Sequence, residues 1–282
     1  MSEKALRKLG ITRTDDPDVQ PTKGVLLRVT SDAYHQVMRT LKPILAGMGD
    51  AGVWTTGSAG SWNTEHPYAK SGTQVADTGD IDVFLDSDMM RDDLGLPADA
   101  DEKIVRQAVL DRISAHYPAL KLTHVHLGFP AGKTVDGMPA YYQVDLFIMP
   151  HAHQVARHHE HDYSIKSTPY KGVDQQLAMA SLVNTIPGHP DKTFQYNGLG
   201  GTLQRRDTKE VVSRDIDEIA EILLGPGHSA TELGSVESIV KAVGGIKSPR
   251  LAQFRDDMAK KYPHLKEGTS DWFRSITQKL SI

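Results

Sequence analysis

The chain has 282 residues, 39% of them hydrophobic and 24% charged, and a formal net charge of -4. This length suits one large domain or two moderate ones with a sizeable core. The sequence contains no cysteine, which excludes a disulfide framework, a thiol nucleophile and a thiolate metal site. It has no apolar run near the roughly 18 residues of a membrane-spanning helix, and no signal-peptide core at its start. We therefore expect a cytoplasmic protein without a membrane partner.

Charge is distributed unevenly along the sequence. From Lys241 onward there are nine Lys and Arg residues against four Asp and Glu, so the preceding 240 residues are acidic. This asymmetry suits an enzyme that binds a polyanion at one end and a metal at the other, and it suits solvated helix faces equally well. The overall acidity argues against a protein that coats long duplex DNA.

The first part of the chain predicts alternating helices and strands. Residues 1–24 are polar and interrupted by prolines, which predicts a loose lead-in. An amphipathic helix capped by Ser31 follows, and Pro43 predicts a kink or a stop near Leu41. Residues 53–56 predict a short strand.

Later segments complete the predicted fold. A polar loop at 63–79 precedes a strand at 78–86, a helix from about 99 to 117 and a hairpin of strands at 121–129 and 141–149. Beyond Pro150 the periodicity becomes helical, with helices predicted at 173–185, 213–224, 235–243, 249–261 and 270–280 and a hairpin at 199–213. We therefore predict an α+β fold, with a small mixed sheet in residues 1–150 and a mostly helical domain in residues 151–282.

Asp80 and Asp82 are the most informative residues of the sequence. Side chains alternate along a strand with period two, so these carboxylates share one face of the strand at 78–86. Two carboxylates held together raise each other's pKa unless a cation lies between them. A divalent metal with oxygen ligands is the simplest such cation. The pair therefore predicts a metal-dependent phosphoryl- or nucleotidyl-transfer site.

Two other segments supply the parts that such a site needs. Gly57 and Ser58 follow the short strand in a tight turn, where backbone N–H groups can approach a phosphate. Gly60-Ser61 is an alternative position for this turn. Asp145 lies in an otherwise apolar strand, where an unpaired carboxylate is costly, and a metal shared with Asp80 and Asp82 would compensate its charge.

The order of these segments resembles the signature of the DNA polymerase β-like nucleotidyltransferase superfamily. The matching residues are Thr56-Gly57-Ser58, Asp80-Ile81-Asp82-Val83 and Val144-Asp145-Leu146. The resemblance covers roughly residues 30–150, and the long segment 59–79 is an insertion of unassigned role relative to the usual spacing.

The resemblance implies a palm-like sheet that carries the carboxylates on neighbouring strands. It implies that Asp80 and Asp82 bind two Mg²⁺ or Mn²⁺ ions, and that Asp145 binds the catalytic ion and orients the attacking group. Gly57 and Ser58 would contact the phosphates of an incoming nucleoside triphosphate, ATP among them. A lysine before the helix at 173–185 contacts the triphosphate in several such families, which makes Lys166 and Lys171 candidates, although a solvated turn explains them equally well.

Several other residues carry weaker signals. The histidines between His151 and His161 could form a zinc site, but a polar connecting loop is the favoured interpretation. Residues 205–209 predict a charged hairpin turn that could touch nucleic acid, but an ordinary solvated turn is the favoured interpretation. Trp54 is predicted to be in the core, and Trp62 could stack on a base if the loop folds over the site.

The sequence thus predicts transfer of a nucleoside monophosphate from an NTP to an acceptor hydroxyl, with release of pyrophosphate. An RNA or tRNA 3′ end is the favoured acceptor; a short oligonucleotide, a small molecule and a protein side chain are alternatives. Two further hypotheses are a catalytically inactive nucleic-acid-binding module of the same fold and a metal-dependent phosphohydrolase. The sequence gives no indication of the oligomeric state.

Overall fold

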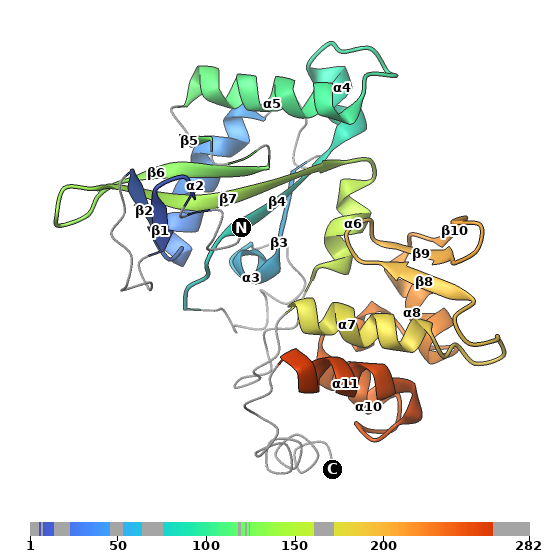
Figure 1. The fold of residues 1–282 in the computed structure, drawn as a ribbon. Coiled ribbons are helices and arrows are strands. Elements are labelled where there is room, and N and C mark those ends of the chain that lie inside the picture. Colours follow the sequence, from blue (N-terminus) through green and yellow to red (C-terminus); the bar gives the residue numbers. More distant parts are fainter. Residues whose placement is uncertain are drawn as a thin grey trace. The chain divides into compact units, whose positions relative to one another are not determined.

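The computed structural model describes residues 6, 8–13, 23–45, 53–63, 76–117, 120–121, 123, 125–160 and 172–261. The chain divides into two compact units, Met1–Ala156 and Arg157–Ile282. Figure 1 shows the helices and strands of each unit. The helix predicted at 270–280 and most of the 59–79 segment lie outside the described residues.

A mixed sheet forms the centre of the first unit. Its described residues contain seven strands in the order β1-β2-β7-β4-β3, with β6 on the opposite edge of β7 and β5 paired with β6. The strands are β1 (Ile11–Arg13), β2 (Gly24–Leu26), β3 (Val53–Thr56), β4 (Ile81–Asp86), β5 (Leu120–Lys121), β6 (His126–Lys133) and β7 (Pro139–Met149).

Strand β7 organises this sheet because three strands pair with it. Strand β6 is antiparallel to it, which confirms the predicted hairpin. Strands β2 and β4 run parallel to β7 and pair with successive parts of its other edge, β2 at residues 140–141 and β4 at residues 144–149. Gln143 therefore lies on β7 between the stretches that pair with β2 and β4.

Helix α2 (Ser31–Ile44) packs against the sheet as its apolar stripe requires. Its N-cap is Thr30, whose side chain accepts a hydrogen bond from Ala33 N, so the predicted cap at Ser31 is wrong by one residue. The helix does not stop near Leu41; Pro43 lies in its last turn and the helix ends at Ile44. Proline has no N–H, so the helix lacks the bond that residue 43 would otherwise donate to the carbonyl of residue 39.

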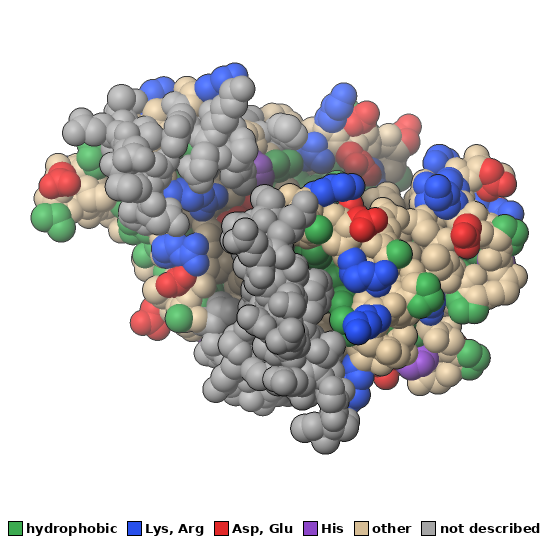
Figure 2. Space-filling model, turned by 60° about the horizontal axis from the view of Figure 1, so that its bottom comes forward, with side chains coloured by type: hydrophobic (Ala, Val, Ile, Leu, Met, Phe, Trp, Pro, Cys, Tyr) green, Lys and Arg blue, Asp and Glu red, His purple; other side chains and the backbone are tan. Residues whose placement is uncertain are grey.

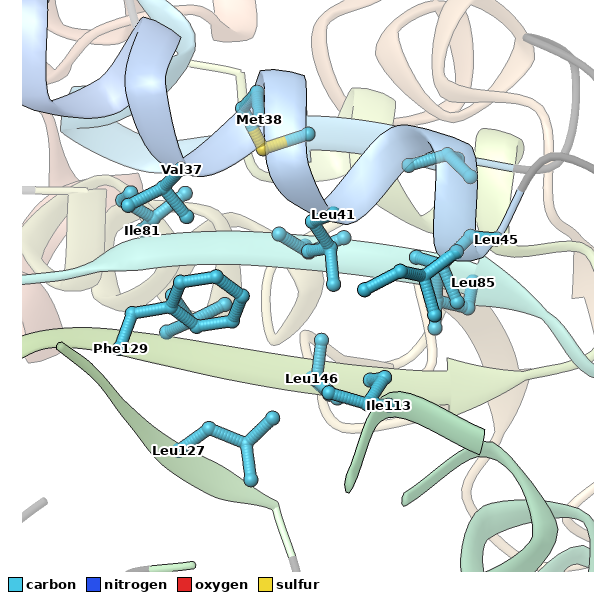
Figure 3. Packing of buried hydrophobic residues seen from close by; sticks show 14 of the residues in the cluster. Val37, Met38, Leu41, Leu45, Ile81, Leu85, Ile113, Leu127, Phe129 and Leu146 are labelled. Carbon is cyan, nitrogen blue, oxygen red and sulfur yellow. The ribbon is translucent and has the colours of Figure 1, made fainter. Parts of the chain in front are cut away.

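One face of the sheet is covered by α2 and by α5 (Glu102–His116). Figure 3 shows Leu41 of α2 and Ile113 of α5 pointing toward Leu85 and Leu146 of the sheet, all within one buried cluster. Side chains at alternate positions must then point to the other face. The odd-numbered positions of β4 and the even-numbered positions of β7 form the core, which leaves Asp82 and Asp145 on the opposite face.

The opposite face is partly covered by α6 (Ala152–His158). Phe84 and Phe147 stack there with ring centroids 4.8 Å apart, and Phe84 packs with Ala152, Val155 and Ala156. The prediction of a polar connecting loop at this point was therefore wrong. An apolar stripe with helical spacing lies between the histidines, and its burial against the sheet stabilises the helix.

The second unit combines helices with a small sheet. Strands β8 (Phe194–Asn197), β9 (Thr202–Arg205) and β10 (Val211–Ser213) form an antiparallel sheet in the order β10-β9-β8, where one hairpin was predicted. The helices are α7 (Gly172–Val183), α8 (Ile216–Leu224), α9 (Ala230–Leu233), α10 (Val236–Ala242), the 3-10 helix η4 (Pro249–Leu251) and α11 (Ala252–Lys261). The α+β class is thus confirmed. Among the described helices, including the short α3 (Gly57–Gly60) and α4 (Ser87–Asp93), none is long and apolar enough to cross a membrane.

Helix α5 offers a matched pair of isoleucines for testing the core. Ile113 is fully buried, whereas Ile104 is 53% exposed. We expect Ile113→Ala to lower the free energy of unfolding by about 2–5 kcal/mol, because it leaves a cavity under the sheet. Ile104→Ala should change it by less than about 0.5 kcal/mol. Urea denaturation measures both values, and equal effects would contradict the packing described here.

Candidate active site

Four polar residues lie side by side across four strands of the main sheet. Strand register pairs Thr56 of β3 with Asp82 of β4, Asp82 with Asp145 of β7, and Asp145 with His126 of β6. Directly paired residues point to the same face of a sheet. Thr56, Asp82, Asp145 and His126, here called the polar row, therefore line the face opposite α2 and α5.

Asp80 joins this row from the residue position just before β4. Burial and the charge of Asp145 raise the pKa of the Asp80 carboxyl, and the guanidinium of Arg13 partly offsets them. Burial and the charges of Asp80 and Asp145 raise the pKa of Asp82 well above its usual value. The structure thus brings the three predicted carboxylates together, close enough to repel one another.

Gly57 adjoins the carboxylate of Asp82 at the end of β3. Its φ is +67°, a value that side chains disfavour, and a Cβ atom placed on it would overlap Oδ2 of Asp82. The backbone can approach the carboxylate this closely because glycine has no side chain. The tight turn predicted at Gly57-Ser58 is observed as the single helical turn α3.

Ser58 and Ser61 differ in their positions on this turn. Ser58 is half-buried, whereas Ser61 is fully buried and its hydroxyl donates to the carbonyl of Ser58 at 2.8 Å. Gly60 is buried as well. Gly57-Ser58 is therefore the part of the turn next to Asp82, and the alternative turn at Gly60-Ser61 is part of the interior.

The Asp145 carboxylate contacts two side chains that the sequence analysis did not single out. Gln143 Nε2 donates to Oδ1 of Asp145 at 2.8 Å. His126 Nδ1 lies 2.7 Å from the same oxygen, as an ion-pair contact without the alignment of a hydrogen bond. Asp145 is only 5% exposed. The hydrogen bond from Gln143 stabilises a carboxylate that is otherwise largely withdrawn from water.

Arg13 connects this group to the segment before β4. Its guanidinium donates to Gln143 Oε1 at 2.9 Å and to the carbonyl of Gly79 at 3.2 Å. Arg28 also lies near Gly79 and forms an exposed ion pair with Asp77. The predicted loose lead-in at residues 1–24 therefore contains a strand, β1, that carries a residue of the site.

The sequence gives different amounts of information about Gln143, His126 and Arg13. Gln143 is two positions before Asp145 on one strand, so the period of two places them on the same face, and the sequence contained this information. His126 depends on the register between β6 and β7, which the sequence does not show. Arg13 lies on a three-residue strand in a polar segment and gave no signal.

Other predicted residues fall outside the site or outside the described chain. Lys166, Lys171 and His161 are not among the described residues. Trp62 is 1% exposed and packs against Tyr34, with ring centroids 5.8 Å apart, so stacking on a base is excluded in this conformation. Trp54 packs at the edge of the cluster that contains Phe84.

His158 has a structural role in the second unit. Its Nε2 lies 2.9 Å from the carbonyl of Arg214 and its Nδ1 lies 2.8 Å from the hydroxyl of Tyr196. A carbonyl only accepts, so Nε2 carries the proton and Nδ1 accepts from Tyr196. Burial lowers the pKa of His158 to about 4. Within the described part of the chain, no three His, Asp or Glu side chains converge closely enough to form a metal site as they stand, and this holds for Asp80, Asp82 and Asp145 as well.

The charged turn at 205–209 is partly used inside the fold. The guanidinium of Arg206 donates to the carbonyls of Lys192 and Phe194 and to Oδ1 of Asn184. Arg205 forms an exposed contact with Asp207 at 3.5 Å. Arg206 therefore holds the turn against the rest of the second unit.

Comparison of the chain with protein-family models gave no match, and comparison with curated protein sequences gave none either.

Gly57 and Gly95 both have left-handed backbone angles, so comparing their alanine variants distinguishes backbone strain from steric crowding. Gly57 has φ +67° beside Asp82, and Gly95 has φ +63° with open space around a Cβ position. We expect Gly95→Ala to destabilise the protein by about 1 kcal/mol through backbone strain alone. Gly57→Ala should cost about 1–3 kcal/mol more, because the new methyl group displaces the carboxylate. Urea denaturation measures the difference; equal losses would show that the methyl group fits beside Asp82.

The stability of the second unit should depend on pH through His158. Between pH 6.5 and about 4 the unfolded chain protonates this histidine and the folded chain does not, so acidification favours unfolding, by about 3 kcal/mol over the window. Burial raises the pKa of Glu160 to about 7, so its contribution falls as pH rises from 4.5 to 7 and opposes the first.

The two contributions separate in a Glu160→Gln background. There we expect the melting temperature to fall on acidification from pH 6.5 to 4, and His158→Gln to flatten this dependence. Calorimetry at several pH values measures it, and an unchanged slope in the double variant would contradict the role given to His158.

Proposed function

We propose that this chain is a metal-dependent nucleotidyltransferase of the DNA polymerase β-like kind. The observation that supports this proposal is the register of β4 and β7, which places Asp82 beside Asp145. Asp80, two residues before Asp82, is close enough for its charge to interact with both. Gly57 lies directly against the same carboxylate. Three sequence segments chosen for their chemistry thus meet at one place.

The donor set fits a hard divalent cation. All three side chains offer carboxylate oxygens, the ligands that Mg²⁺ and Mn²⁺ prefer. The pKa values of Asp80 and Asp82 are raised by burial and by repulsion between the carboxylates, and a cation would relieve the repulsion. A bound Mg²⁺ or Mn²⁺ would lower the pKa of the attacking hydroxyl and stabilise the leaving pyrophosphate. Asp80 and Asp82 would hold two ions, and Asp145 would share one of them.

The chain's own residues would position the reactants. The acceptor hydroxyl oxygen attacks the α-phosphorus of the NTP, a new P–O bond forms, and the bond to the bridging oxygen breaks to release pyrophosphate. Asp145 would orient the acceptor hydroxyl, and the hydroxyl proton would pass to this carboxylate or to solvent. Gly57 and Ser58 would contact the triphosphate through the backbone N–H groups of their turn.

For the acceptor we propose a nucleic-acid 3′ hydroxyl, with a small molecule or a protein side chain as alternatives. The basic excess after Lys241 supports a polyanion only in part. Arg250 donates to the carbonyls of Thr185 and Leu223, and Arg255 donates to internal carbonyls as well. Figure 2 shows Lys and Arg side chains interspersed with acidic and hydrophobic ones rather than gathered into one band.

The test is transfer of label from each of the four α-³²P-labelled NTPs in the presence of Mg²⁺ or Mn²⁺. Total RNA, short oligonucleotides and the protein alone serve as acceptors. We expect label on RNA 3′ ends, abolished by EDTA and reduced at least about 100-fold by Asp80→Asn, Asp82→Asn and Asp145→Asn.

Asp111→Asn is the matched control, because Asp111 is exposed on α5 and its carboxylate accepts a hydrogen bond from Gln107, away from the proposed site. It should retain wild-type transfer. Label on the protein itself would redirect the acceptor to a side chain. Absence of transfer to any acceptor, with the protein folded and metal present, would favour the inactive nucleic-acid-binding module.

A further inference from the structure

The guanidinium of Arg13 links the segment before Asp80 to the strand that carries Asp145. Arg13 lies on β1, at the edge of the sheet, and its fork reaches Gln143 on β7 and the peptide of Gly79. Gly79 immediately precedes Asp80. Gln143 lies between the stretches of β7 that pair with β2 and with β4. Arg13 thus connects the backbone beside Asp80 to the strand that carries Asp145.

The orientation of the Gln143 amide follows from its two partners. An arginine side chain has only donors, so the oxygen of the amide must face Arg13. The amide nitrogen is then directed at Oδ1 of Asp145, 2.8 Å away, and an ionised carboxylate can only accept. Gln143 is completely buried. Water therefore does not replace either contact, and the amide cannot turn over without losing both.

The contacts of Asp145 leave one of its oxygens for another ligand. Gln143 and His126 both approach Oδ1. Within the described part of the chain, no hydrogen bond or ion pair reaches Oδ2. A carboxylate held by one oxygen presents the other in a fixed direction, which is how outer partners orient metal-ligating side chains.

We propose that Arg13 and Gln143 are positioning residues for the metal ligands. Together they hold the Asp145 carboxylate by Oδ1, so that Oδ2 is left for a metal ion, and they fix the distance between Asp145 and the peptide that precedes Asp80. This inference rests on the proposed function, because it assigns the purpose of the arrangement to metal binding.

The chain offers a conservative variant and a matched control. Arg13→Lys keeps the positive charge beside Asp80 but cannot bridge Gln143 and Gly79 at once. Arg28→Lys makes the same replacement at a second arginine near Gly79, whose partner is Asp77 in an exposed ion pair. Gln143→Leu removes the bond to Asp145 at nearly constant volume. Any effect of charge alone is thus separated from an effect of geometry.

The experiment measures binding of Mn²⁺ to the protein without NTP, by the electron paramagnetic resonance of free Mn²⁺, alongside kcat and the KM for NTP. We expect Arg13→Lys and Gln143→Leu to weaken Mn²⁺ binding about 10–100-fold and to lower kcat similarly. The KM for NTP should stay within about threefold, because the triphosphate contacts are elsewhere. Arg28→Lys should bind Mn²⁺ within twofold of wild type. Excess Mn²⁺ should restore part of the kcat of Arg13→Lys.

Two results would overturn this inference and are distinct from each other. If the wild type binds Mn²⁺ and transfers nucleotide, and both variants do so equally well, Arg13 and Gln143 are structural only and the proposed function stands. If the wild type neither binds Mn²⁺ nor transfers nucleotide, the proposed function fails and the positioning role fails with it. A melting temperature for each variant shows whether a loss comes from unfolding instead, and Arg13→Lys, on a half-buried residue, then decides the matter.

Discussion

The parallel pairing of β4 with β7 is the constraint on which the rest of the first unit depends. A single register places Val83 beside Leu146 on the face that α2 and α5 cover, and Asp82 beside Asp145 on the other face. A slip by one residue would exchange the two faces and bury a carboxylate in the apolar core. The hydrophobic core therefore enforces the meeting of the carboxylates, although it never touches them.

The same arrangement opposes stability at the site. Burial and mutual repulsion disfavour the ionised forms of Asp80 and Asp82, and the backbone at Gly57 adopts a conformation that other residues disfavour. Such features persist in folded proteins where the surrounding structure holds them in place. Here Arg13 donates to Gln143, which in turn donates to Asp145. The stacked Phe84 and Phe147 anchor the same face farther along the strands.

Much of the fold and part of the site could be predicted from local patterns. The helical stripe beginning near Tyr34 and the apolar strands around Asp82 and Asp145 identified α2, β4 and β7, because periodicity is a local property. The sequence did not show α6, since its short apolar stripe lies among histidines and is stabilised by packing on Phe84. His126 and Arg13 could not be found, because each reaches Asp145 or Gln143 through a strand register or a contact 130 residues apart in the chain.

The position of Arg13 has a consequence for how the chain can be shortened. A polar, proline-interrupted segment at the start of a protein is commonly removed to obtain a more compact molecule. Here that trimming would delete β1 and with it the guanidinium that orients Gln143. The sheet would lose a three-residue edge strand and the buried contacts of Leu6 and Ile11 with Leu26, and the Asp145 carboxylate would be held less firmly. Because Arg13 of β1 orients Gln143 of β7, a shortened chain has to keep both residues.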